Sequence, residues 1–353
     1  MEGQDNYPNM IMSFIYPVRE TTLLFVILTF LYLCSCTRLE YNEKTKLKHN
    51  EMTKSTALET ENIYIFTYND DPLMRLDSYQ YYKTLDNPHI GIDSRSGNKV
   101  CIICANSHKE SYHWHEIQSY GHLKKMTFRL EDENPDFPIA SSELKINAGQ
   151  NKIDISAALK PFLSEIILNS IKVDFKDEAY RGSKLENIKV YLTNVNAEIS
   201  LLDDYRYRQK RIINLRALDE KAVQACSYPS MLRRTLEDIE DGKVVQPKYI
   251  FNCFPNTCKQ ESLGSPFTRI VIEAQINGNT YWYPININRH TKSPNRNSSE
   301  EGIGVERNCK YIYNITIKKL GSDDPDKPVD FAAVESKLII KPWKELEEYD
   351  INF

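Results

Sequence analysis

The feature that most constrains the fold is a β-hairpin signature at residues 267–288, which read FTRIVIEAQINGNTYWYPININ. Two runs rich in β-branched and aromatic residues flank Asn277-Gly278, a pair that tolerates the positive φ angles of a type I′ turn. Pro284 in the second run cannot donate to a hydrogen-bond ladder, so we expect this strand at a sheet edge. Alternation in the same run places on one face Tyr281, Tyr283, Ile285 and Ile287.

Other strand patterns follow one another along most of the chain. They are residues 63–68, 99–106, 126–130, 171–175, 187–202, 311–321 and 337–343. Residues 159–169 have a proline near their start and apolar residues at 162, 163, 166 and 167, a spacing that predicts a helix. Such a chain is expected to be mostly β, with little helix, and to form two tandem β-sandwich domains.

A basic, tyrosine-containing stretch at residues 205–216 marks the predicted domain boundary. The domains would then be residues 55–205 and 206–353. A net charge of −4 over the whole chain does not indicate nucleic acid as a partner. We therefore interpret the basic stretch as a solvated connection between the domains rather than as an anion-binding patch.

The one long apolar run, residues 21–34, follows Arg19 close to the N-terminus. It is shorter than the roughly 20 residues that a membrane-spanning helix needs, and this length is typical of a secretory signal. The run ends in Leu33-Cys34-Ser35-Cys36, the pattern of a bacterial lipoprotein signal if Cys36 is the modified residue. Modification at Cys34 would place the bulky Leu33 next to the cut.

We therefore predict a lipoprotein signal peptide at residues 1–35, with Met10 and Met12 as alternative starts, and a polar tether at residues 36–54. Cys36 would carry a diacylglyceryl group and an acylated amine. Several acyl chains together give stable membrane anchoring, whereas a single chain binds only marginally. The alternative is an ordinary signal peptide whose two cysteines have no role.

One group of residues has a spacing that resembles a zinc site: Cys101, Cys104, His108, His113 and His115. The two cysteines lie in an apolar run that is predicted to be a strand. Residues three apart in a strand point to opposite faces, so the pair cannot hold one ion. We expect a buried strand followed by a histidine-containing loop, and no metal.

Two further groups of residues have side chains that could bind a metal or form a disulfide. Asp323, Asp324 and Asp326 could bind calcium, but they lack the spaced ligands of a calcium loop, so we expect a solvated turn. Cys253 and Cys258 could close a small disulfide in an oxidising compartment. The sequence contains no phosphate-binding loop, nucleophile elbow or zinc-helix motif. It therefore predicts no enzyme, no cofactor and no small-molecule substrate.

The C-terminal part of the chain resembles the fimbrillin family, the subunits of type V pili of Gram-negative gut and oral anaerobes. The resemblance rests on RNCKYIYNITIKKLGSDDPDKP (307–328), KLIIKPWKE (337–345) and GNTYWYPINI (278–287), with looser matches in the first half. It implies tandem β-sandwiches, lipoprotein export to the outer membrane, polymerisation with other fimbrial subunits through donated strands, and no catalysis.

Stalk subunits of that family are cut after an arginine just before the first retained strand. Lys54 stands at the matching place, and the tether before it lacks the apolar alternation of a removable strand. These departures favour a lipid-anchored base subunit or accessory subunit that stays uncut. The alternatives are an accessory tip adhesin and a surface glycan-binding lipoprotein, which would need an exposed aromatic platform at Tyr281, Trp282 and Tyr283.

The chain ends in YDINF, in which Tyr349, Ile351 and Phe353 alternate and would share one face of a strand. An uncut anchor keeps its own groove filled, so it could join a fibre only by giving a strand to a neighbour. We therefore predict these three residues as donor-strand residues. The alternative is that the tail packs back on its own domain or frays.

Overall fold

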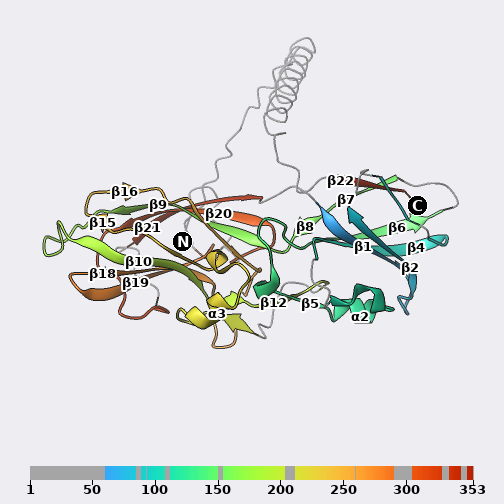
Figure 1. Cartoon of the computed structure of the whole chain (residues 1–353), viewed down its shortest axis with the longest axis horizontal. Helices are drawn as coiled ribbons and strands as arrows, with labels where there is room; N and C mark the ends of the chain where they lie inside the picture. The colour runs from blue at the N-terminus through green and yellow to red at the C-terminus, as the bar shows by residue number, and fades with distance from the viewer. Residues whose placement is uncertain are drawn as a thin grey trace, which may run out of the picture. The chain divides into compact units, whose positions relative to one another are not determined.

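The computed structural model describes residues 60–84, 89–92, 94–107, 112–149, 154–202, 211–258, 260–289, 304–327, 334–342 and 348–352. Residues 57–353 form one compact unit by their internal contacts. Within the described residues the structure is built mainly from antiparallel sheets with short helices, which confirms the predicted fold class (Figure 1). No helix of the described residues is long and apolar enough to cross a membrane.

The first half of the chain supplies a five-stranded sheet, and a three-stranded sheet accompanies it. In sheet order the five strands are β2 (Leu76–Thr84), β1 (Glu61–Asn69), β4 (Gly97–Ala105), β6 (Ala140–Ala148) and β8 (Lys160–Pro161). The three strands are β3 (His89–Gly91), β22 (Glu348–Asn352) and β7 (Asp154–Ala158).

Two larger sheets hold most of the remaining strands. One contains β14 (Arg233–Thr235), β10 (Lys184–Thr193), β18 (Arg269–Ile276) and β19 (Asn279–Asn286), with β15 (Ile239–Glu240) also on β10. The other contains β16 (Val244–Val245), β9 (Ser164–Val173), β20 (Cys309–Ile317) and β21 (Val334–Pro342), with β17 (Tyr249–Cys253) also on β9. Buried side chains of β9, β10, β18 and β20 belong to one continuous core, as in a β-sandwich.

Among the described residues, the minor elements are two short strand pairs and five helical turns. The pairs are β11 (Val195–Asn196) with β13 (Ile212–Ile213), and β12 (Glu198–Ser200) with β5 (Thr127–Arg129). The helical turns are η2 (Trp114–Glu116), α2 (Tyr120–Lys124), η3 (Leu130–Asp132), α3 (Glu220–Gln224) and η4 (Pro229–Met231).

The predicted hairpin is confirmed. Strands β18 and β19 pair antiparallel around Asn277 and Gly278, whose φ angles are 50° and 80°. Strand β19 lies at the edge of its sheet, as Pro284 indicates. Tyr283, Ile285 and Ile287 are buried in the core, and Tyr281 packs against it partly exposed. The alternating pattern therefore predicted the buried face correctly.

The predicted helix over residues 159–169 is wrong, because these residues include β8 and most of β9. Strand β9 is central in its sheet, with hydrogen-bonded neighbours on both sides. Its Ile166 and Leu168 are fully buried, and Ile167 on the other face is partly buried. Apolar residues on both faces of a central strand imitate helical spacing, which explains the error.

The predicted domain boundary falls among residues 203–210, which lie outside the described residues. Strands β9 and β10 precede it in the chain, yet they pair with β17, β18 and β20, which follow it. Strands β1, β2, β4, β6 and β8 pair among themselves, whereas β9 and β10 belong to the two larger sheets with strands from the second half of the chain. The division of the chain into two folding domains stays a prediction.

Candidate strand-exchange site

The last described strand, β22, lies between two strands from the first half of the chain. It pairs parallel with β3, where Ile351 is opposite Ile90. It pairs antiparallel with β7, where Ile351 is opposite Ile155 and Tyr349 is opposite Ala157 (Figure 1). Neither β3 nor β7 pairs with any other described strand, so the three-stranded sheet depends on β22.

A separate hydrophobic cluster connects this small sheet with the five-stranded one. Its buried members are Ile63, Ile65, Ile92, Cys101, Ile103, Ala105, Ala140, Ala157 and Leu159. Most come from β1, β4 and β6, whereas Ala157 belongs to β7, and Ile92 and Leu159 directly follow β3 and β7. Loss of β22 would leave unpaired backbone groups on β3 and β7 and loosen the cover over this cluster.

The predicted donor residues can be placed only in part. Tyr349 and Ile351 are in β22, at alternate positions of an extended strand, as expected. Phe353 and the predicted lipid-attachment residue Cys36 lie outside the described residues. The strand is seated in its own chain, on strands from residues 89–91 and 154–158 rather than on the C-terminal sheets. Its exchange with another subunit stays a prediction.

Arg307 joins the start of β20 to the five-stranded sheet, and sequence reasoning missed this role. Its guanidinium donates to Pro161 O at 2.9 Å, to Ser141 Oγ at 3.0 Å and also to Lys160 O. It lies 3.9 Å above the ring of Phe162, a cation–π contact. Arg307 stands in the motif that carries the family resemblance, but the sequence of that motif does not predict which residues Arg307 contacts.

Cys101 and Cys104 point to opposite faces of β4, as predicted. Cys101 belongs to the cluster beneath the three-stranded sheet, and Cys104 belongs to the large core on the other face. Burial raises the pKa of the Cys101 thiol to about 12. In the described part of the chain, no three His, Cys, Asp or Glu side chains form a metal-binding group.

Of the three aspartates that were expected to form a solvated turn, Asp324 and Asp326 have hydrogen-bond partners in the chain. Asp326 accepts a hydrogen bond from Arg269, with 2.6 Å between its Oδ1 and the guanidinium. Arg269 is 1% exposed and also pairs with Glu261 at 2.6 Å. Asp324 caps the local turn by accepting the N–H of Asp326 at 2.8 Å. This loop therefore neutralises a buried arginine.

Cys253 and Cys258 are free thiols in the structure, so the possible disulfide is not formed. Cys253 is buried at the end of β17. The Cys258 thiol lies 3.4 Å from the carbonyl oxygen of Ser265 instead. Burial raises the pKa of both thiols above the ordinary value, which disfavours the thiolate that thiol chemistry requires.

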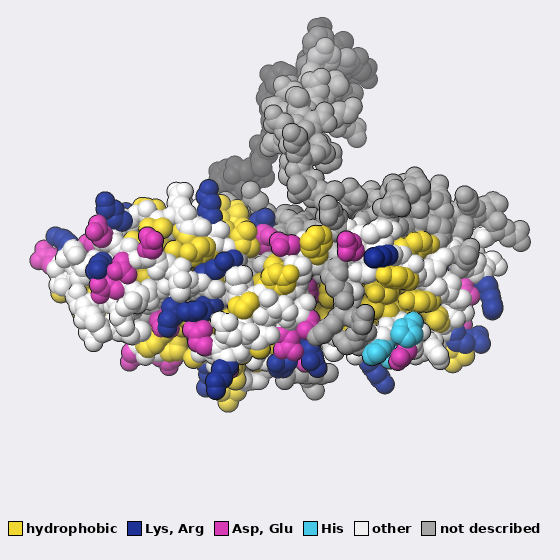
Figure 2. Space-filling model, viewed as in Figure 1, with side chains coloured by type: hydrophobic (Ala, Val, Ile, Leu, Met, Phe, Trp, Pro, Cys, Tyr) yellow, Lys and Arg dark blue, Asp and Glu magenta, His cyan; other side chains and the backbone are white. Residues whose placement is uncertain are grey.

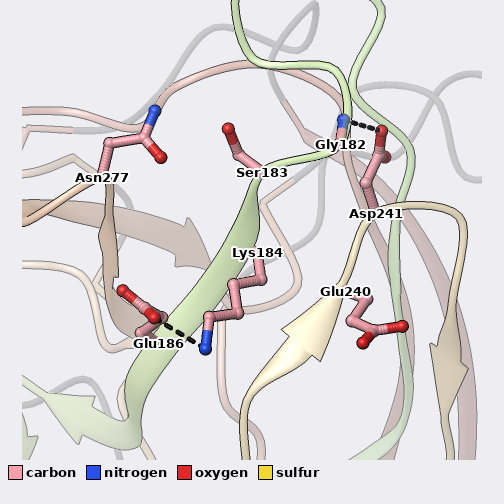
Figure 3. Close-up of a pocket in the computed structure, with 7 residues that line it drawn as sticks. All are labelled: Gly182, Ser183, Lys184, Glu186, Glu240, Asp241 and Asn277. Atoms are coloured by element: carbon pink, nitrogen blue, oxygen red, sulfur yellow. Dashed lines mark hydrogen bonds and ion pairs between the residues drawn. The ribbon is translucent and has the colours of Figure 1, made fainter.

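A polar pocket lies between the ends of β10, β15 and the β18–β19 turn (Figure 3). Lys184 in it pairs with Glu186 at 2.8 Å and with Asp238 at 3.2 Å. Asp241 accepts the backbone N–H groups of Gly182 and Phe175, both at 3.0 Å. Lys184 and Asp241 are thus held by partners in and beside the pocket, an arrangement typical of a structural turn.

Among the described residues, the aromatic and basic side chains that could favour a glycan or an anionic partner make contacts within their own chain. Of the residues that a glycan-binding platform would need, Tyr283 is fully buried and donates to Lys319 O at 3.0 Å, while Trp282 donates to Glu273 at 3.2 Å. In the basic stretch, Arg211 pairs with Glu131 at 3.0 Å. Basic and acidic side chains are interspersed on the face shown in Figure 2.

No protein-family model and no curated protein matches this chain by sequence. Solved structures do match its fold. A fimbrilin from Porphyromonas gingivalis has a TM-score of 0.58 at 11% identity, covering 83% of this chain and 94% of its own. A candidate cell adhesion protein from Bacteroides eggerthii has a TM-score of 0.57 at 14% identity, covering 81% and 90%. A candidate cell adhesion protein from Parabacteroides distasonis has a TM-score of 0.56 at 15% identity, and the match covers 82% of this chain and 96% of that protein.

The chain therefore has the fimbrilin fold, and the resemblance drawn from residues 278–345 is confirmed at the level of fold.

Proposed function

We propose that this chain is a non-enzymatic structural subunit of a cell-surface fimbria, held in the outer membrane by a lipid on Cys36. The observation that carries the proposal is the position of β22, the C-terminal strand, between β3 and β7. The fold similarity to a fimbrilin and to candidate adhesion proteins supports the same assignment.

The small sheet supplies a physical route to assembly. A strand that enters between β3 and β7 gains main-chain hydrogen bonds from two neighbours, and alternate side chains set its register. A strand of the same pattern from a second subunit would make equivalent bonds. Exchange of one strand for the other therefore changes the free energy little, while it joins two subunits.

The place of the subunit at the base of the fibre, or as an accessory subunit, is inferred from the N-terminal residues Cys36 and Lys54. A chain that keeps its lipid stays with the membrane, and Lys54 at the expected processing position favours an uncut chain. An accessory tip subunit of the same architecture would instead be found at the far end of the fibre, without the lipid.

Deletion of residues 349–353 from the chain, made in the bacterium that produces it, tests the proposal. The truncated protein should be exported and folded, yet fibres should detach into the medium, because the anchor no longer gives a strand to its neighbour. A matched variant, Ile351→Val, keeps the strand pattern and should keep the fibres attached. Fibres that stay cell-bound after the deletion would show that the tail is not a donor.

A further inference from the structure

Three polar side chains meet on adjacent strands at one end of the five-stranded sheet. Lys99 Nζ lies 2.5 Å from Asn69 Oδ1 and 2.9 Å from Asp77 Oδ2. Asn69 ends β1, Asp77 is in β2 and Lys99 is in β4, and β1 is between the other two strands. The Lys99 and Asp77 side chains are only 1% and 2% exposed.

The sheet register fixes this contact. Asn69 is opposite Lys99 in the β1–β4 ladder, a position from which the two side chains reach each other without moving the backbone. Asp77 is held from the other side, since its Oδ2 accepts Ser94 Oγ and the Arg95 N–H, both at 2.9 Å. An amine and a carboxyl group that are buried from water thus lie beside a partly buried carboxamide.

Because Lys99 and Asp77 are buried, the position of the proton between them decides whether Lys99 can act as a nucleophile. Burial alone would raise the pKa of Asp77, but hydrogen bonds from Lys99, the Arg95 N–H and Ser94 lower it, so the resting Asp77 is a carboxylate. A buried ammonium and carboxylate can neutralise each other by moving one proton across their hydrogen bond. The product is a neutral, desolvated lysine amine, which is a nucleophile.

We propose that Lys99 and Asn69 become joined by an isopeptide bond, with Asp77 as the proton carrier. The Lys99 amine gives one proton to Asp77 and attacks Cγ of Asn69, so that a C–N bond forms. The bond from Cγ to the carboxamide nitrogen breaks, and that nitrogen takes the proton held by Asp77 together with the second amine proton. Ammonium leaves, Asp77 is a carboxylate again, and no oxidant, metal or cofactor takes part.

The cross-link would tie β1 to β4, the two strands that supply most of the cluster beneath the three-stranded sheet. Lys99 is also opposite Ile146 of β6, a residue that packs on the same cluster. A covalent bond at this point would hold β1 and β4 of the five-stranded sheet together even when β22 leaves the neighbouring three-stranded sheet or is pulled.

Peptide mapping of the purified full chain tests the assignment. Trypsin does not cleave after an acylated lysine, so the digest should contain a branched peptide, one ammonia lighter than its parts, joining the segments of Asn69 and Lys99. Asp77→Asn keeps the size of the side chain but cannot carry the proton, and this variant should give the two linear peptides. Lys99→Arg, which keeps the charge, should do the same.

Three results would overturn the assignment. Linear peptides of unaltered mass from the native chain would mean that the group is a plain ion pair. Loss of ammonia with normal cleavage after Lys99 would indicate cyclisation at Asn69-Asp70, although the Asp70 N–H that this needs donates to Asn98 O at 2.9 Å. A branched peptide that has lost water would place the bond on Asp77. Because the native chain decides each case, an unfolded variant cannot mask the answer.

Discussion

Ile351 of β22 lies opposite Ile155 of β7 in an antiparallel ladder, although the two residues come from opposite halves of the chain. On its other edge the same residue is opposite Ile90 of β3. Removal of β22 would leave β3 and β7 without their shared partner in the described part of the chain.

A chain that ends at residue 347 should bind a synthetic peptide of residues 348–353, because β3 and β7 are then left without their shared partner. Calorimetry should detect a one-to-one complex. A peptide with Ile351→Pro loses one main-chain donor and should bind about tenfold more weakly or worse. If the truncated chain has native circular dichroism and binds neither peptide, the site does not accept a strand from outside.

Cys36→Ser should abolish labelling of the chain by a clickable palmitate, because the predicted lipid is attached to that thiol and to the amine it exposes. Cys34→Ser is the matched control and should keep the label. Label that persists in the Cys36 variant would refute the lipoprotein assignment and leave an ordinary signal peptide.

Stability should fall as pH rises because of Glu133, a fully buried carboxyl group whose Oε2 accepts the N–H of Ile139 at 3.2 Å. Burial raises the pKa of Glu133 to about 8, above its usual value near 4.5. The folded chain therefore holds a proton that the unfolded chain has lost. Its contribution is complete below about pH 4.5 and is lost as pH rises to about 8.

Glu133→Gln removes this titration while it keeps the shape of the side chain. Its free energy of unfolding should change less between pH 5 and pH 8 than that of the native protein, and urea titrations at the two values measure the difference. Equal pH dependence in both proteins would show that Glu133 is ionised in the folded state.

Asp326→Ala should lower the free energy of unfolding by about 2 kcal/mol, because it removes a charged hydrogen-bond partner of the buried Arg269. The neighbouring exposed Asp323→Ala should change it by less than about 0.5 kcal/mol. The two values come from parallel denaturant titrations. Equal losses of unfolding free energy in the two variants, or losses that depend on added calcium, would instead support calcium binding by this loop.

Local chemistry predicted much of the fold but little of the site. Asn277-Gly278 and the alternation that follows it required one hairpin, and the apolar run at Cys101 required a strand with its thiols on opposite faces. Spacing failed at Ile166–Leu168, where burial on both faces of a central strand resembles a helix. It also could not identify the partners of β22 or Arg307, because these contacts join residues far apart in the chain, and no local pattern encodes their pairing.

The central claim is that β22 leaves its own chain when the subunit joins a fibre. Glu348 is opposite the exposed Ala158 in the β22–β7 ladder, so Glu348→Cys with Ala158→Cys can staple the strand in place. The most direct measurement is the fraction of internally stapled chains, identified by peptide mass, in sheared fibres and in the unassembled pool. We expect stapled chains in the pool and none in the fibres, with incorporation restored by reduction. Stapled chains present in fibres at the same fraction as in the pool would contradict it.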